Sequence, residues 1–214
     1  MHTIDLETWP RREHYKFLST WDYPHFNMCA NVEISEFYAA VKHRGISINI
    51  AIVYVLARAA NAIPEFRSRI RGDKVVEYEI VHPSTTILAD DDLFTFCTIE
   101  YSEDFVAFAA RAGEQIAHVR ENPYVENGLE QDQLLYMTAI PWVSFSSFMH
   151  PIDLSPVDSV PRFAWGKFFE QGERLMMPLS VQGHHALMDG IHMGMYYEKV
   201  QDYLNHPGRI LSGT

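Results

Sequence analysis

The sequence predicts an α/β (α+β) sandwich, in which a mixed, largely antiparallel sheet is covered by helices. Three observations lead to this prediction: apolar residues alternate with polar ones in several segments, they recur every three or four residues in others, and glycine-containing turns join neighbouring strand segments. Hairpins combined with amphipathic helices are typical of a layered sheet with covering helices.

Helices are predicted where apolar residues recur three or four positions apart. The first has Pro10 in its first turn, a position that proline favours. Residues 48–63 are apolar on almost every side, so their length favours a buried helix, which Pro64 ends. In chain order the predicted helices are Arg11–Ser19, Glu36–His43, Ile48–Ile63, one that is capped by Ser102 and runs to about Arg120, and Ile191–Leu204.

Strands are predicted where residues alternate, as over 26–34, or where short apolar runs lie between turns. Gly72-Asp73 and Gln171-Gly172 have the composition of hairpin turns. The predicted strands are Thr3–Ile4, Phe26–Ile34, Arg67–Arg71, Lys74–Val81, Thr85–Leu88, Phe94–Tyr101, Leu134–Ile140, Trp142–Phe148, Phe163–Phe169 and Arg174–Gln182.

Irregular backbone is expected over Asn122–Gln133, which is polar, and over Pro151–Pro161, which contains three prolines. Asp90-Asp91-Asp92 can be interpreted as a cation site or as a solvated turn. The turn is favoured because three consecutive side chains cannot all converge on one ion.

Length and composition predict one domain over residues 1–214, since 214 residues with 47% hydrophobic content can bury one core and no linker divides them. A net charge of -11 argues against binding to nucleic acid or to a membrane surface. The longest apolar run is too short to cross a bilayer, and the N-terminus lacks signal-peptide features. With only two cysteines, Cys29 and Cys97, we expect a cytoplasmic protein.

The richest chemistry lies in His184-His185-Ala186-Leu187-Met188-Asp189-Gly190, between a predicted buried strand and the last helix. An imidazole can remove a proton from a hydroxyl that attacks an acyl carbonyl. Alternatively, both histidines are structural. A third interpretation makes His185, Asp189 and His192 a zinc face at helical spacing, although Gly190 weakens a helix through all three. We therefore expect no metal.

This H-H-x-x-x-D-G pattern resembles the active-site signature of chloramphenicol acetyltransferases, which also occurs in the catalytic cores of 2-oxo acid dehydrogenase acyltransferases. Further collinear blocks match the former: Trp9 with Arg11-Arg12-Glu13-His14, Tyr101-Ser102, Pro141-Trp142-Val143 with Phe145, and Gln171-Gly172-Glu173-Arg174-Leu175 running into Pro178-Leu179-Ser180-Val181-Gln182. The resemblance implies a two-layer sandwich and a homotrimer with active sites at subunit interfaces. It also implies direct acetyl transfer from acetyl-CoA to a small hydroxyl acceptor, chloramphenicol, in a ternary complex.

By the same resemblance, His185 is the general base and faces the 18–28 region of a neighbouring chain, while His184 is structural. Asp189 pairs with Arg11 as a structural support instead of completing a triad with His185. The Thr138 hydroxyl replaces the family's serine as oxyanion donor, next to acetyl-CoA, and Lys167 matches a cofactor-binding lysine.

Several positions depart from the family's pattern. Ser47 and Asn49 stand where the family has a lysine and a tyrosine that bind coenzyme A. We expect weaker binding of coenzyme A unless Lys42, Arg44 or Lys167 supplies the missing positive charge. Ala164 replaces a threonine. The expected acceptor pocket consists of Leu18, in place of a tyrosine, and of Phe26, Phe94, Phe145 and Phe163, although such aromatic residues are more often core. Two alternatives follow: a different acceptor or acyl donor, and a non-catalytic paralogue.

Overall fold

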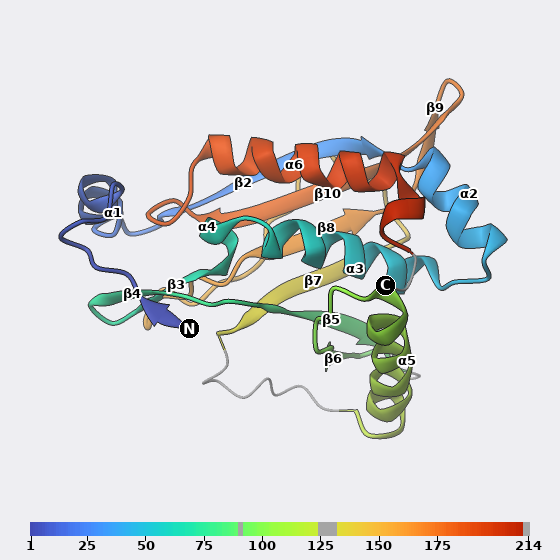
Figure 1. Cartoon of the computed structure of the whole chain (residues 1–214), viewed down its shortest axis with the longest axis horizontal. Coiled ribbons are helices and arrows are strands. Elements are labelled where there is room, and N and C mark those ends of the chain that lie inside the picture. The colour runs from blue at the N-terminus through green and yellow to red at the C-terminus, as the bar shows by residue number, and fades with distance from the viewer. Residues whose placement is uncertain (90–91, 124–131, 212–214) are drawn as a thin grey trace.

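A long mixed sheet extends through most of the protein (Figure 1). The computed structural model describes residues 1–89, 92–123 and 132–211. Within them the strand order is β2, β10, β8, β7, β5, β6, and β9 also pairs with β10. Strand β7 is parallel to β5 and β8, and the other pairs are antiparallel, which confirms the predicted fold class. The strands are β2 (His25–Glu33), β5 (His82–Leu88), β6 (Phe94–Thr98), β7 (Leu134–Ile140), β8 (Arg162–Gly166), β9 (Phe169–Gln171) and β10 (Arg174–His184).

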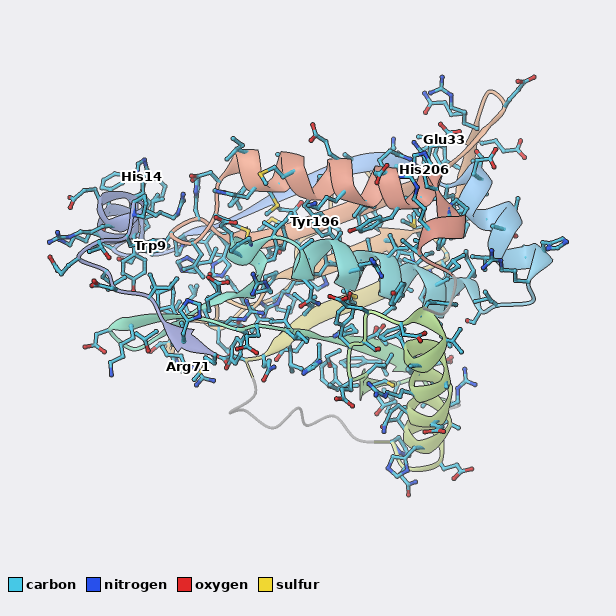
Figure 2. All side chains as sticks on the ribbon, in the orientation of Figure 1. Trp9, His14, Glu33, Arg71, Tyr196 and His206 are labelled. Atoms are coloured by element: carbon cyan, nitrogen blue, oxygen red, sulfur yellow. The ribbon has the colours of Figure 1, made fainter. Side chains whose placement is uncertain are left out.

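Two helices, α3 and α6, lie side by side across one face of this sheet (Figure 1). Nearly every residue of α3 after its first turn is buried, as its apolar sequence predicts. Helix α6 turns Met193, Tyr196, Val200 and Leu204 inward. Tyr196 lies between the helices and the sheet (Figure 2), and its ring stacks on Phe66 with centroids 4.8 Å apart. The helices are α1 (Arg12–Leu18), α2 (Ser35–His43), α3 (Ile48–Asn61), α4 (Pro64–Arg67), α5 (Phe105–Glu121), α6 (Gly190–Asn205) and the 3-10 turn η1 (Pro207–Arg209).

The side chains of strand β10 make contacts on both faces of the sheet. Its odd-numbered residues Met177, Leu179 and Val181 join the core under the helices. Its alternate side chains Ser180 and Gln182 hold the segment 142–161 on the other side: the Ser180 hydroxyl donates to the Phe148 carbonyl at 2.9 Å, and Gln182 Oε1 accepts from the His150 amide at 2.9 Å. One strand therefore positions both the core and this irregular segment.

The hairpin predicted at Gly72 forms a separate small sheet instead of joining the main one. It consists of β1 (His2–Thr3), β4 (Lys74–Glu77) and β3 (Ser68–Arg71), in that order. Gly72 adopts a left-handed φ of 61°, which glycine tolerates at no steric cost. None of the helices in the described ranges is both long and apolar enough to span a membrane.

The predicted strand over Trp142–Phe148 is wrong. This segment has no regular structure, and two of its carbonyls accept isolated hydrogen bonds instead of a strand ladder: the Val143 carbonyl accepts from the Lys167 amide at 2.9 Å, and the Phe148 carbonyl from the Ser180 hydroxyl. The predicted strand over Phe163–Phe169 is also interrupted after Gly166. Residues 90–91 and 124–131, which fall in the predicted acidic turn and polar loop, lie outside the described residues.

Candidate active site

The two adjacent histidines lie where β10 ends and the chain turns toward α6. The amides of Leu187 and Met188 both donate to the His184 carbonyl, at 2.9 and 3.2 Å, which closes a tight turn. The His185 amide donates to the Pro24 carbonyl at 2.7 Å, so the turn is also joined to the chain that enters β2. These hydrogen bonds fix the backbone position of His185, to which the imidazole is attached.

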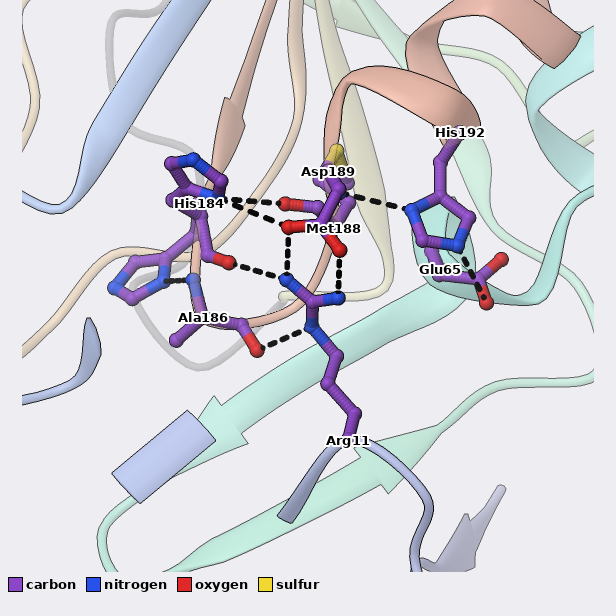
Figure 3. Close-up of polar contacts among 8 residues, drawn as sticks. Arg11, Glu65, His184, Ala186, Met188, Asp189 and His192 are labelled. Atoms are coloured by element: carbon purple, nitrogen blue, oxygen red, sulfur yellow. Dashed lines mark hydrogen bonds and ion pairs between the residues drawn. The ribbon is translucent and has the colours of Figure 1, made fainter. Parts of the chain in front are cut away.

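Arg11, from the turn before α1, holds this loop together (Figure 3). Its guanidinium donates to both carboxylate oxygens of Asp189, to the Ala186 carbonyl at 2.9 Å and to the His185 carbonyl at 2.7 Å. These hydrogen bonds to Arg11 hold the pKa of the Asp189 carboxyl below its usual range. Arg11 and Asp189 thus form the ion pair that the resemblance implied, with the guanidinium bridging three residues of the loop.

The His185 imidazole uses only one of its nitrogens within the described part of the chain. Nδ1 lies 3.2 Å from the Met188 carbonyl oxygen and 3.2 Å from Asp189 Oδ1. Both atoms accept hydrogen bonds, so Nδ1 carries the proton in the neutral ring and Nε2 keeps its lone pair. The side chain is 38% exposed, and its ring lies against Phe26 with centroids 4.6 Å apart. Nε2 therefore has no partner among the described residues, on a side chain that is partly exposed.

His184 has a different environment although it is the next residue. It is buried, its Nδ1 accepts from the Ala186 amide at 3.2 Å, and its ring meets His25 edge-on at 4.8 Å. Burial, together with the neighbouring His25, lowers the pKa of His184 to about 3. A ring that is sealed and neutral cannot exchange protons with a substrate, so only His185 of the pair fits the role of a base.

His192 supports the loop from the first turn of α6. Its Nδ1 accepts from the Asp189 amide at 2.8 Å, and its Nε2 lies 3.4 Å from Glu65 Oε1 (Figure 3). Both nitrogens already have partners, which argues against a zinc face with His185 and Asp189. Among the described residues no group of three or more His, Cys, Asp or Glu side chains could hold a metal ion.

Two cavities adjoin each other at strands β5 and β7. Their walls share Thr86, Leu88, Ala139 and Trp142. The first cavity, of about 940 Å³, is lined by Thr138, by aromatic residues and by a polar group formed by His150, Asp153, Asp158 and Arg162. The second cavity, of about 600 Å³, is lined by Asn49, Trp165 and two cations, Arg120 and Lys167. Neither of these described cavities is lined by His185.

The expected acceptor residues are distributed over several places. Phe94 lines the first cavity, Phe26 packs on His185, and Phe145 packs on Phe148 with ring centroids 5.5 Å apart. Leu18 is buried at the end of α1. Phe163 is fully buried in the core against Phe66, and it lines neither cavity because its side of β8 faces the helices.

The first cavity also contains residues that the sequence does not predict as part of a site. Phe96 and Tyr136 line the first cavity, as do His150 and Arg162. Alternation along β6 and β7 puts Phe94 with Phe96, and Tyr136 with Thr138, on the same face of each strand, and this signal is available in the sequence. Of the proposed substitutes for the family's lysine, Lys167 lines the second cavity, whereas Lys42 and Arg44 line neither.

The family model for chloramphenicol acetyltransferase matches residues 1–201. The chain belongs to the chloramphenicol acetyltransferase family. It is 32% identical over 205 residues to a chloramphenicol acetyltransferase from a Klebsiella species, covering 94% of this chain and 92% of the relative. It is also 32% identical to one from Streptomyces acrimycini, covering 95% of this chain and 94% of the relative. This family membership makes the protein an acyltransferase.

Solved structures agree with this assignment. A chloramphenicol acetyltransferase superposes with a TM-score of 0.85 at 28% identity, covering 95% of this chain and 99% of that structure. The dihydrolipoamide acetyltransferase of Azotobacter vinelandii superposes with a TM-score of 0.69 at 19% identity, covering 93% and 88%. The second likeness shows that the acyltransferase cores share the fold of this family member.

Proposed function

We propose that the protein is an acetyl-CoA-dependent O-acetyltransferase that transfers an acetyl group to a small hydroxyl acceptor of the chloramphenicol type. The observation that carries this proposal is the state of His185: Nδ1 is held by two acceptors, while Nε2 keeps its lone pair on a side chain that is 38% exposed. The family membership supports the same chemistry. The proposal takes residues 1–214 as one acyltransferase domain, and the cytoplasmic location remains a prediction.

In the proposed reaction, Nε2 of His185 accepts the proton of the acceptor hydroxyl while that oxygen attacks the thioester carbonyl. The Thr138 hydroxyl donates a hydrogen bond to the oxyanion of the tetrahedral intermediate. Collapse breaks the carbon–sulfur bond, and the departing thiolate takes the proton from His185. The acetyl group passes directly from sulfur to oxygen, without an acyl-enzyme and without a metal.

The charge of the second cavity supports coenzyme A as the donor. Arg120 and Lys167 line it, and no acidic side chain of the described residues does, although the chain as a whole carries a net charge of -11. Two cations in one cavity attract the phosphates of coenzyme A. We expect Arg120→Ala and Lys167→Ala each to weaken coenzyme A binding about 5- to 10-fold, with a shallower dependence on salt. Unchanged binding in both variants would contradict this placement.

The separation of His185 from the first cavity supports a site shared between chains. Thr138 lines that cavity and His185 does not, so on this proposal the base reaches the acceptor from another copy of the chain. We propose that a homotrimer supplies His185 of one copy to the cavity of the next. Mixing His185→Ala with Thr138→Val subunits under exchange conditions should restore activity, because some interfaces then combine two intact residues. Activity after exchange that does not rise above that of the two separate variants, or full activity in an isolated monomer, would refute the shared site.

A coenzyme A release assay with acetyl-CoA and chloramphenicol tests the reaction itself. We expect turnover by the wild type and a loss on the order of 10³-fold in His185→Ala. Release with other alcohols but not with chloramphenicol would favour a different acceptor, and release from other acyl-CoA donors a different donor. No release with any of them would favour a non-catalytic paralogue.

A further inference from the structure

His150 lies in the first cavity, in the irregular segment that packs on β10. Gln182 holds its backbone from both sides: the His150 amide donates to Oε1 at 2.9 Å, and Nε2 of Gln182 donates to the His150 carbonyl at 3.5 Å. The ring meets Phe148 edge-on with centroids 4.7 Å apart. The position of His150 in the cavity wall is therefore fixed by a buried amide of the sheet.

Both ring nitrogens of His150 are shielded from solvent and have no hydrogen-bond partner among the described residues. Burial, reinforced by Arg162, lowers the pKa of His150 to about 4, so the ring is neutral at neutral pH. It then offers one donor and one acceptor. Buried polar groups without partners are rare in proteins, and each calls for an explanation such as a catalytic or ligand-binding role, strain, or a bound water or ion.

The charges around His150 indicate what kind of group it receives. Arg162 donates to the Asp158 carboxylate and to the Val160 carbonyl at 2.9 Å, so its positive charge is already neutralised within the wall. Asp92 and Asp153 also line the cavity. An acceptor with a carboxylate would meet like charges there and no unpaired cation of the described wall, whereas a neutral amide or hydroxyl would meet His150.

We propose that His150 recognises the acceptor substrate by a neutral hydrogen-bonding group separate from the hydroxyl that is acetylated. The inference rests on the proposed function, because it takes the first cavity as the acceptor site. The proposal requires a rotation about the broad χ2 torsion, which would turn one nitrogen toward the cavity and leave the backbone that Gln182 holds in place. His150 is thus a specificity-determining residue of the acceptor site.

Three secondary benzylic alcohols that differ in one substituent test this proposal: 1-phenylethanol carries a methyl group, mandelamide a neutral amide and mandelate a carboxylate. Calorimetric titration gives the affinity of each, and coenzyme A release gives its kcat/KM. We expect the wild type to favour mandelamide over 1-phenylethanol about 10- to 100-fold, and mandelate to be the poorest of the three.

The His150→Leu variant should abolish the preference for mandelamide, while His150→Gln, which keeps a donor and an acceptor, should retain part of it. Met149→Leu is the matched control, since Met149 is exposed and lines neither cavity. Because leucine removes two unpartnered nitrogens, we expect His150→Leu to unfold at a urea concentration no lower than the wild type.

A wild type that does not distinguish mandelamide from 1-phenylethanol, or a preference that survives in His150→Leu, would overturn the assignment. The calorimetric comparison decides this without turnover. A protein that shows the preference in binding but releases no coenzyme A with any acyl donor and alcohol would refute the proposed function and leave the recognition by His150 supported.

Discussion

Removal of the Arg11 side chain is expected to lower the free energy of unfolding by about 2 to 4 kcal/mol. Arg11→Ala loses the hydrogen bonds to Asp189, His185 and Ala186 together. Breaking a buried ion pair typically costs about 3 to 5 kcal/mol, and we lower this figure because the Asp189 side chain is 33% exposed and water can solvate part of it.

Comparison variants separate the ion pair from the bonds to the backbone. Asp189→Asn should cost only about 1 to 2 kcal/mol, because Arg11 keeps the two carbonyl acceptors. The double variant should show a coupling energy of about 1 to 2 kcal/mol. Arg12→Ala is the matched control: Arg12 pairs with Glu7 and Glu13, whose carboxylates are largely exposed, and such surface pairs contribute about 0 to 1 kcal/mol.

Urea unfolding of the four variants measures these differences, and the coenzyme A release assay measures whether the loop still orients His185. We expect Arg11→Ala to lose activity even at temperatures where it is fully folded, since two of its bonds hold the backbone of 185 and 186. A stability loss in Arg11→Ala no greater than in Arg12→Ala, or no measurable coupling with Asp189→Asn, would refute this reasoning.

Thr138→Val should lower kcat about 100-fold and Thr138→Ser should restore most of it, as measured by coenzyme A release, and equal activity of the three proteins would remove the hydroxyl from the oxyanion role. Gly166→Ala should destabilise by about 1 to 3 kcal/mol in urea unfolding, because a Cβ there would lie 2.7 Å from the Val143 carbonyl oxygen. Gly113 lies in the middle of α5, where a Cβ would meet no atom within 4 Å, so Gly113→Ala should instead stabilise the protein by about 0.5 to 1 kcal/mol. A Gly166→Ala variant more stable than Gly113→Ala would contradict the close packing at Gly166. The folded-state pKa values of His184 and His150, about 3 and about 4, are below the value of about 6.5 for an unfolded histidine. The unfolded chain therefore binds more protons between these values, so the free energy of unfolding should fall as the pH decreases from 6.5 to 4.5, by up to about 1.4 kcal/mol per pH unit for each ring. His150→Leu should show a shallower decrease, and a slope identical to that of the wild type would show that His150 titrates normally.

The elements with a clear period could be predicted from the sequence. Strand β2, the buried helix α3 and the amphipathic helix α6 all form close to their predicted bounds, because a period of two or of 3.6 residues is the direct imprint of one buried face. The segment 142–148 has strand-like composition but is held by single bonds from Ser180 and Lys167, which are distant in sequence. The sequence predicts only that Pro64 ends the preceding helix, whereas Pro64 also begins the short helix α4.

Part of the candidate site could likewise be predicted from the sequence, and part could not. The H-H-x-x-x-D-G loop could be located from a linear pattern and its partner Arg11 from the resemblance to a family, whereas most members of the two cavities could not be located. Phe163 sits on a strand whose inward face the alternation alone does not identify, and it belongs to the core. No pattern in the neighbouring sequence identifies His150 or Arg120 as a cavity residue. Each becomes one because residues distant in the sequence line the same cavity.

The contact between Arg11 and Asp189 spans 178 positions of the chain. During synthesis, the guanidinium leaves the ribosome long before its carboxylate partner does. The loop that carries His185 can therefore reach its working shape only after Asp189 has left the ribosome. A nascent chain that already contains strands β2 to β8 would still lack a positioned imidazole, which ties the onset of activity to the emergence of the loop that contains Asp189.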